Sequence, residues 1–144
     1  MEPTFHYQVM AAHTDFQKKV LNRLRREGLT AGQPKVLDYL KDHNGANQKA
    51  IAQGCHMEPA SVSSVLAGME HGGLIARQAE PGDRRSLRVY LTPLGEEKSR
   101  LTQQAFEDLE AQALRGLDQS QRQTLIALLV QVAENLKDEK GEEK

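Results

Sequence analysis

Residues 47–92, NQKAIAQGCHMEPASVSSVLAGMEHGGLIARQAEPGDRRSLRVYLT, decide the fold of this chain. Asn47 can cap a short helix that ends near Gly54, and Pro59 suits the first turn of a second helix. In the second helix, apolar side chains recur at steps of three and four residues: Val62, Val65, Leu66 and Met69. This spacing predicts two consecutive helices, the second with one buried face.

The apolar period changes to two after this helix pair, which is typical of β-strands. Residues 74–79 and 86–91 alternate in this way, and the segment Glu80–Arg85 between them has the chemistry of a turn. A short helix, an amphipathic helix and a hairpin in this order predict a winged helix-turn-helix. In such a unit the second helix fits the major groove of DNA.

Further helices are expected on both sides of this unit. Apolar residues at three- and four-residue steps predict one over residues 4–26. Thr30 and Gln33 have capping-box spacing and open another, and Thr92-Pro93 starts a long helix after the hairpin. Asp118 opens the last helix, whose apolar arc is wider than one stripe. The expected fold class is therefore mainly α with a small β-hairpin wing.

The charge of the chain is unevenly distributed. The 144 residues carry a formal net charge of −1, which by itself argues against a nucleic-acid-binding protein. Residues 1–100, however, hold 14 basic and 11 acidic residues, a net of +3. Residues 101–144 hold 5 basic and 9 acidic residues, a net of −4. The first two thirds of the chain could therefore meet an anion, and the tail could not.

Several classes of protein are disfavoured by what the sequence lacks. No apolar run approaches the ~18 residues of a membrane span, and the N-terminus does not resemble a signal peptide, so a cytoplasmic protein is expected. Cys55 is the single cysteine, and the five histidines show no convergence of ligands, so no metal site is predicted. The chain has no Gly-rich phosphate loop, nucleophile elbow or HExxH motif, so neither an enzyme nor a cofactor is predicted.

Two groups of residues in the winged unit suit contact with DNA. The outward face of the second helix carries short polar side chains: Ser61, Ser63 and Ser64. They would let the backbone approach a groove closely, although an ordinary solvated face is the alternative. At the hairpin tip, Arg84 and Arg85 could enter the narrow, negatively charged minor groove, and Asp83 could hold a guanidinium in position. The alternative for the tip is an ordinary charged turn.

The winged unit resembles the MarR family of bacterial transcriptional regulators. The residues that carry the resemblance are Leu29-Thr30-x-x-Gln33, Ile51-Ala52, Ser61-Val62-Ser63, Met69-Glu70-x-x-Gly73-Leu74-Ile75-x-Arg77, and Asp83-Arg84-Arg85-Ser86 followed by Val89-Tyr90-Leu91-Thr92-x-x-Gly95. The last two blocks, at this separation, are strongly specific. Residues 1–28 and 96–144 match only as amphipathic helices.

The resemblance implies a homodimeric repressor that binds a pseudo-palindromic operator in double-stranded DNA and is released by a small-molecule effector. Residues 29–95 would be the winged helix-turn-helix DNA-binding region, and 1–28 and 96–144 would be dimerisation helices of one intertwined domain. The implied DNA-binding residues are Asn47, Gln48, Lys49, Ser61, Ser63, Ser64, Arg77, Asp83, Arg84 and Arg85. Among them, Arg85 would enter the minor groove, Asp83 would steer it, and Arg77 would be the wing-base arginine.

Three questions stay open at this point. The second helix has no lysine or arginine, which favours, as an alternative, a winged-helix protein-interaction module without specific DNA binding. Cys55 could make the protein a redox sensor, although its place in the turn of the helix-turn-helix favours a buried packing residue. A small aromatic or anionic effector would bind near His13, Phe16 and Tyr39, between the dimer helices and the winged unit.

Overall fold

The computed structural model of the chain describes residues 2–137 and, within them, every side chain except those of Arg84 and Arg85. Its contacts divide the chain into two units, residues 1–109 and 110–144. Within residues 2–137, no helix is both long enough and apolar enough to cross a membrane.

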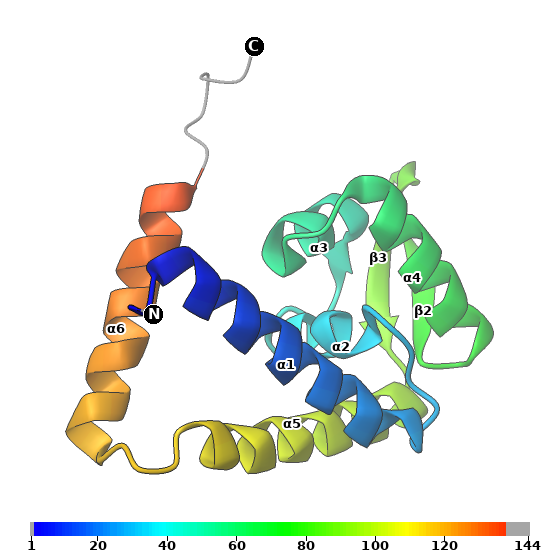
Figure 1. Cartoon of the computed structure of the whole chain (residues 1–144). Coiled ribbons are helices and arrows are strands. Elements are labelled where there is room, and N and C mark those ends of the chain that lie inside the picture. Colours follow the sequence, from blue (N-terminus) through cyan, green and yellow to red (C-terminus); the bar gives the residue numbers. More distant parts are fainter. Residues whose placement is uncertain (1, 138–144) are drawn as a thin grey trace. The chain divides into compact units, whose positions relative to one another are not determined.

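The first unit is a winged helix-turn-helix with two additional helices (Figure 1). Its elements are α1 (Phe5–Arg25), α2 (Gln33–Asp42), β1 (Ala46–Asn47), α3 (Gln48–Cys55), α4 (Pro59–His71), β2 (Ile75–Glu80), β3 (Asp83–Leu91) and α5 (Pro93–Ala113), whose end belongs to the second unit. The strands form one antiparallel sheet in the order β1-β3-β2. The second unit contains α6 (Gln119–Leu136). The predicted fold class is confirmed.

Three of the predicted helix starts form as their sequence signals indicate. The side-chain oxygen of Asn47 accepts a hydrogen bond from the third amide of α3 at 2.8 Å. Asp118 and Gln121 make both hydrogen bonds of a capping box at the start of α6. The hydroxyl of Thr92 accepts from the amide of Gly95 at 3.0 Å, which satisfies a free N–H in the first turn of α5.

The start of α2 differs from the expected capping box. The helix begins at Gln33, and its N-cap is Gly32, whose φ of 87° lies in the left-handed region. Only one half of the box forms, because the side-chain oxygen of Gln33 accepts from the amide of Thr30 at 3.1 Å without a reciprocal cap. Pro34 thereby falls in the first turn, where its missing N–H removes no helical hydrogen bond.

The connection at the tip of the hairpin is shorter than expected. The predicted turn over Glu80–Arg85 is wrong, since β2 continues to Glu80 and β3 already begins at Asp83. Only Pro81 and Gly82 connect the strands, and Gly82 has a φ of 84° that suits a tight hairpin. A register shift beside Glu80 accompanies this turn. The backbone at positions 83–85 is therefore part of a strand.

The short strand β1 was not predicted, because two residues are too few to show an alternating pattern. Ala46 pairs with Val89 of β3, and the amide of Gly45 donates to the carbonyl of Val89 at 2.8 Å. This pairing attaches the start of α3 to the sheet that forms the wing.

The core of the first unit lies among α2, α3, α4 and the sheet, and it is completed by Val20 and Leu24 of α1 and Ala105 of α5. Three of the four predicted core residues of α4 are fully buried, Val62, Leu66 and Met69, and Val65 is partly buried. α5 comes very close to the residue before β2 at Gly95, where an added Cβ would lie 2.0 Å from the carbonyl oxygen of Leu74. α4 is thus held on one face by the core and leaves its other face open.

Two helices expose large apolar side chains in the single chain. On α1 they are Phe5, Tyr7, Val9 and Met10. On α6 they are Leu125, Ile126, Leu128, Leu129, Val130 and Leu136. α6 has no buried residue at all, although its apolar arc predicts contact with more than one neighbour. Exposed apolar surface of this extent indicates a protein-protein interface.

Candidate nucleic-acid interface

α4 presents a small and uncharged outward face. From its second residue to Gly68, every exposed residue is an alanine, a serine or a glycine: Ala60, Ser61, Ser63, Ser64, Ala67 and Gly68. The three predicted serines are therefore on the surface, opposite the buried face. A helix with such short side chains can bring its backbone close to the floor of a major groove.

The start of α3 lies beside the wing. Asn47, Gln48 and Lys49 line an open hollow of about 470 Å³ together with Arg77 and Asp83. The side-chain oxygen of Asn47 accepts a hydrogen bond from the backbone of α3, whereas the side chain of Lys49 is exposed. Five of the ten predicted DNA-binding residues, from three separate segments, therefore meet at one place.

Arg77 is the least accessible of these residues. It rises from β2, and only 20% of its side chain is exposed. Its Nη1 donates to the side-chain oxygen of Gln48 at 3.2 Å, and its Nε lies 3.3 Å from an oxygen of Glu70 on α4. The contact with Glu70 is an ion pair without hydrogen-bond geometry, because the buried Nε has no hydrogen-bond acceptor among the described residues. Arg77 thus connects β2 with both helices of the helix-turn-helix.

A second arginine, which the sequence analysis did not single out, holds the base of the wing. Arg88 on β3 makes two hydrogen bonds to the carboxylate of Glu80, at 2.7 and 2.9 Å, and a third to the carbonyl of Gly45 at 3.1 Å. The hydrogen bonds from Arg88 lower the pKa of Glu80, and those to Glu80 raise the pKa of Arg88. A glutamate and an arginine on neighbouring strands can predict such an ion pair. The prediction requires the register between the two strands, which the sequence does not give.

The tip of the hairpin carries the remaining predicted residues. Asp83 is exposed at the first position of β3. The backbone of Arg84 and Arg85 continues the same strand, and their side chains lie outside the described part of the structure.

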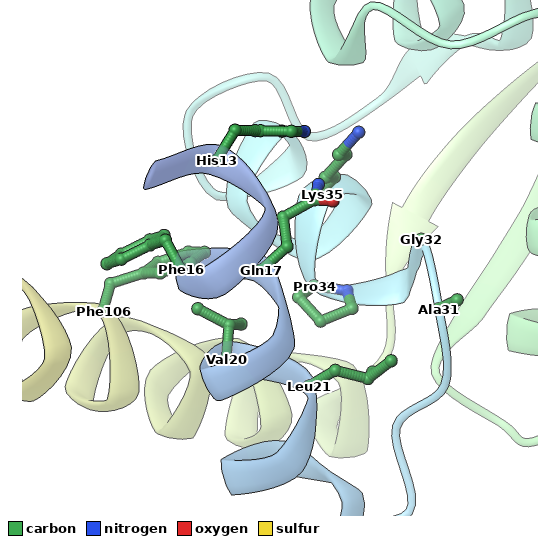
Figure 2. A pocket seen from close by; sticks show the side chains of 10 residues that line it. All are labelled: His13, Phe16, Gln17, Val20, Leu21, Ala31, Gly32, Pro34, Lys35 and Phe106. Carbon is green, nitrogen blue, oxygen red and sulfur yellow. The ribbon is translucent and has the colours of Figure 1, made fainter. Parts of the chain in front are cut away.

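A cavity of about 440 Å³ lies beside the winged unit, among α1, α2 and α5 (Figure 2). Its lining includes His13 and Phe16 from the predicted effector pocket. Phe106 of α5 faces it as well, 90 positions along the chain from Phe16, and Lys35 brings a positive charge. Mixed aromatic and basic walls suit a small aromatic anion.

Tyr39, the third predicted pocket residue, lines a neighbouring hollow of about 600 Å³. The two spaces share His13, Lys35 and Phe106 as lining residues. The ring of Tyr39 is stacked on that of His43, with 4.2 Å between the ring centres. Tyr39 therefore lies next to the cavity that Phe16 lines, but it does not line that cavity itself.

Cys55 is buried, with 8% of its surface exposed. Its thiol donates to the carbonyl of Lys35 at 3.5 Å, and burial raises its pKa. A buried thiol with a raised pKa is a poor nucleophile, so the geometry favours the packing role over the redox sensor. Among residues 2–137, no group of three or more His, Cys, Asp or Glu side chains could hold a metal ion.

Known proteins resemble the chain in sequence and in fold. The MarR family model matches residues 29–87. A protein of Thauera aromatica, named as a transcriptional regulatory protein for the hcr operon, is 31% identical over 103 residues. These cover 72% of this chain and 62% of that protein, so the chain spans less than two thirds of this relative's length.

Two solved complexes with DNA share the fold. The transcriptional repressor CouR, bound to a 23-mer DNA duplex, is 25% identical with a TM-score of 0.81, over 90% of this chain and 92% of CouR. MepR of S. aureus, in complex with DNA, is 24% identical with a TM-score of 0.84, over 94% of this chain and 100% of MepR.

Proposed function

We propose that the chain is a sequence-specific regulator of transcription of the MarR family, whose model matches residues 29–87, and that it binds double-stranded DNA. The observation that carries the proposal is the small, polar face of α4, flanked by the hollow at the start of α3 and by the wing. We further propose that it acts in the cytoplasm as a repressor and not as an enzyme.

The proposed contacts follow from the positions of the three segments. Ser61, Ser63 and Ser64 would contact the major groove, and the start of α3 with Lys49 would bind a phosphate. Arg84 and Arg85 would reach the minor groove, with Asp83 steering Arg85. Asn47 and Gln48 complete the phosphate contact.

A homodimer would place two such units on successive half-sites of a pseudo-palindromic operator. The apolar faces of α1 and α6 support this proposal, because a single chain leaves them exposed. Residues 1–28 and 96–144 would then serve dimerisation, and residues 29–95 would bind DNA.

The effector is proposed to be a small aromatic anion in the cavity lined by His13 and Phe16, with Tyr39 at its border. Gly32 is a wall of this cavity, and an added Cβ there would lie 2.7 Å from Cγ2 of Val65 on α4. Since this wall lies against Val65 of α4, a ligand that displaces the wall would also displace α4. Repression would end when α4 no longer fits the groove.

The DNA-binding proposal is tested by fluorescence anisotropy with a duplex from the promoter region next to the protein's own gene. The Arg85→Ala variant should bind about tenfold more weakly, because one groove contact is worth about 1–3 kcal/mol. The matched control is Arg100→Ala, which removes a surface arginine of α5 and should leave the affinity unchanged. Equal affinities of Arg85→Ala and wild type would contradict the assigned wing contact.

The effector proposal is tested with benzoate as the probe. Benzoate should weaken DNA binding by the wild type, and Lys35→Met should abolish this response because it removes the positive charge of the cavity. Lys41→Met is the control, since Lys41 pairs with Asp42 on the surface and does not line this cavity. If Lys35→Met and wild type respond equally, the proposed site is wrong.

A further inference from the structure

Arg77 of β2 contacts both α3 and α4 in the candidate interface. Its guanidinium is held from two sides, by the side-chain oxygen of Gln48 on α3 and by the carboxylate of Glu70 on α4. With 20% of its side chain exposed, it has little freedom to turn toward a phosphate outside. The charge of Glu70 also offsets the positive charge that a phosphate would meet.

The contact with Arg77 determines how Gln48 presents its amide. Arginine has donors and no acceptor, so Gln48 must turn its oxygen toward Arg77. The NH₂ group of Gln48 then points away from Arg77. Gln48 is the first residue of α3, where the backbone amides and the side chain of Lys49 are also donors.

We infer that Arg77 is a positioning residue for DNA binding, which fixes the amide of Gln48 and the first turn of α3 to donate to a phosphate. It makes no contact with DNA itself. This role differs from the one expected of a wing-base arginine, and it rests on the DNA binding proposed above. A lysine could not take this role, because its single ammonium group cannot both donate in a fixed direction to Gln48 and lie beside Glu70.

The inference is tested by measuring operator affinity across a series of salt concentrations for Arg77→Lys, Gln48→Ala and the double variant. Arg77→Lys keeps the charge but should bind about tenfold more weakly, the effect of one lost charge-assisted hydrogen bond. Its salt dependence should equal that of the wild type, because the weakened contact comes from the uncharged amide of Gln48 and no charged contact with a phosphate is lost. Lys49→Ala is the matched control, and its slope of log K against log salt should become shallower by about 0.9.

The double variant separates positioning from a general structural role. If Arg77 acts through Gln48, Arg77→Lys should cause no further loss of affinity once Gln48 is alanine. Additive losses, or a shallower salt slope for Arg77→Lys, would overturn the inference, and so would wild-type affinity of Arg77→Lys. Gln48→Ala leaves the pair with Glu70 in place, so it carries the test if Arg77→Lys does not fold. Failure of the wild type to bind any operator would instead refute the proposed function.

Discussion

At the scale of single residues, the interface depends on two arginines that are paired within the protein. Arg77 and Arg88 both come from strands of the wing, where an arginine is readily taken for a DNA contact. Each is instead engaged within the protein, Arg77 by Gln48 and Glu70, and Arg88 by Glu80. The wing therefore has arginines that hold its frame as well as arginines at its tip.

Glu80→Gln should loosen the wing in a pH-dependent way. Because Arg88 lowers the pKa of Glu80 in the folded protein, the ionised carboxylate stabilises the wing at neutral pH, and this contribution is lost as the pH falls through the lowered pKa. Hydrogen exchange of the β3 amides should be faster in Glu80→Gln than in wild type at neutral pH, with no difference in strong acid.

Glu97→Gln is the control for this experiment, because it breaks a surface pair with Arg100 that lies outside the wing. It should leave exchange in β3 unchanged. A difference between Glu80→Gln and wild type that persists in strong acid would show that the charge of Glu80 is not the cause.

At the scale of elements, local signals predicted helix starts well and tertiary contacts poorly. The caps at Asn47, Thr92 and Asp118 depend on residues within four positions, and they form as predicted. The start of α2 at Gly32 and the pairing of β1 with β3 depend on contacts between elements. For the same reason no sequence pattern revealed the partners of Arg77 or the role of Arg88.

The space around two helical glycines, Gly95 of α5 and Gly68 of α4, predicts opposite effects of adding a methyl group. Gly95→Ala should destabilise the protein by about 2 kcal/mol or more, because a Cβ there would overlap the backbone carbonyl of Leu74. Gly68→Ala should stabilise it by up to ~1 kcal/mol, because Gly68 lies in α4 with room for a methyl group. Urea unfolding of both variants measures the two changes, and a stable Gly95→Ala would contradict the close approach.

At the scale of the whole molecule, the uneven charge and the exposed apolar helices indicate that different segments serve DNA binding and dimerisation. Residues 1–100 carry a net charge of +3, of which residues 29–95 of the winged unit contribute +1, and the acidic surplus lies in residues 101–144. The apolar faces of α1 and α6 are left exposed in the single chain. Dimerisation through these helices remains a prediction from the exposed surface.

Leu129→Glu should disrupt the proposed dimer. Leu129 lies in the middle of the apolar arc of α6 and is 49% exposed in the single chain, so a charge there would be buried unpaired in a dimer. Gln131→Glu is the control, since two residues along a helix turn the side chain about 200° away. Light scattering should give a monomer or an aggregate for Leu129→Glu and a dimer for Gln131→Glu. If both Leu129→Glu and Gln131→Glu remain dimeric, the apolar face of α6 does not form the interface.

The central claim, sequence-specific binding of double-stranded DNA by a dimer, is tested most directly by selecting bound duplexes from a random pool. The predicted result is a pseudo-palindrome with half-sites about 10 base pairs apart, bound at least about 10³-fold more tightly than a scrambled duplex at the same salt concentration. Recovery of no common sequence, with equal affinity for selected and scrambled duplexes even at low salt, would contradict it. That result would favour a winged-helix module that binds other proteins.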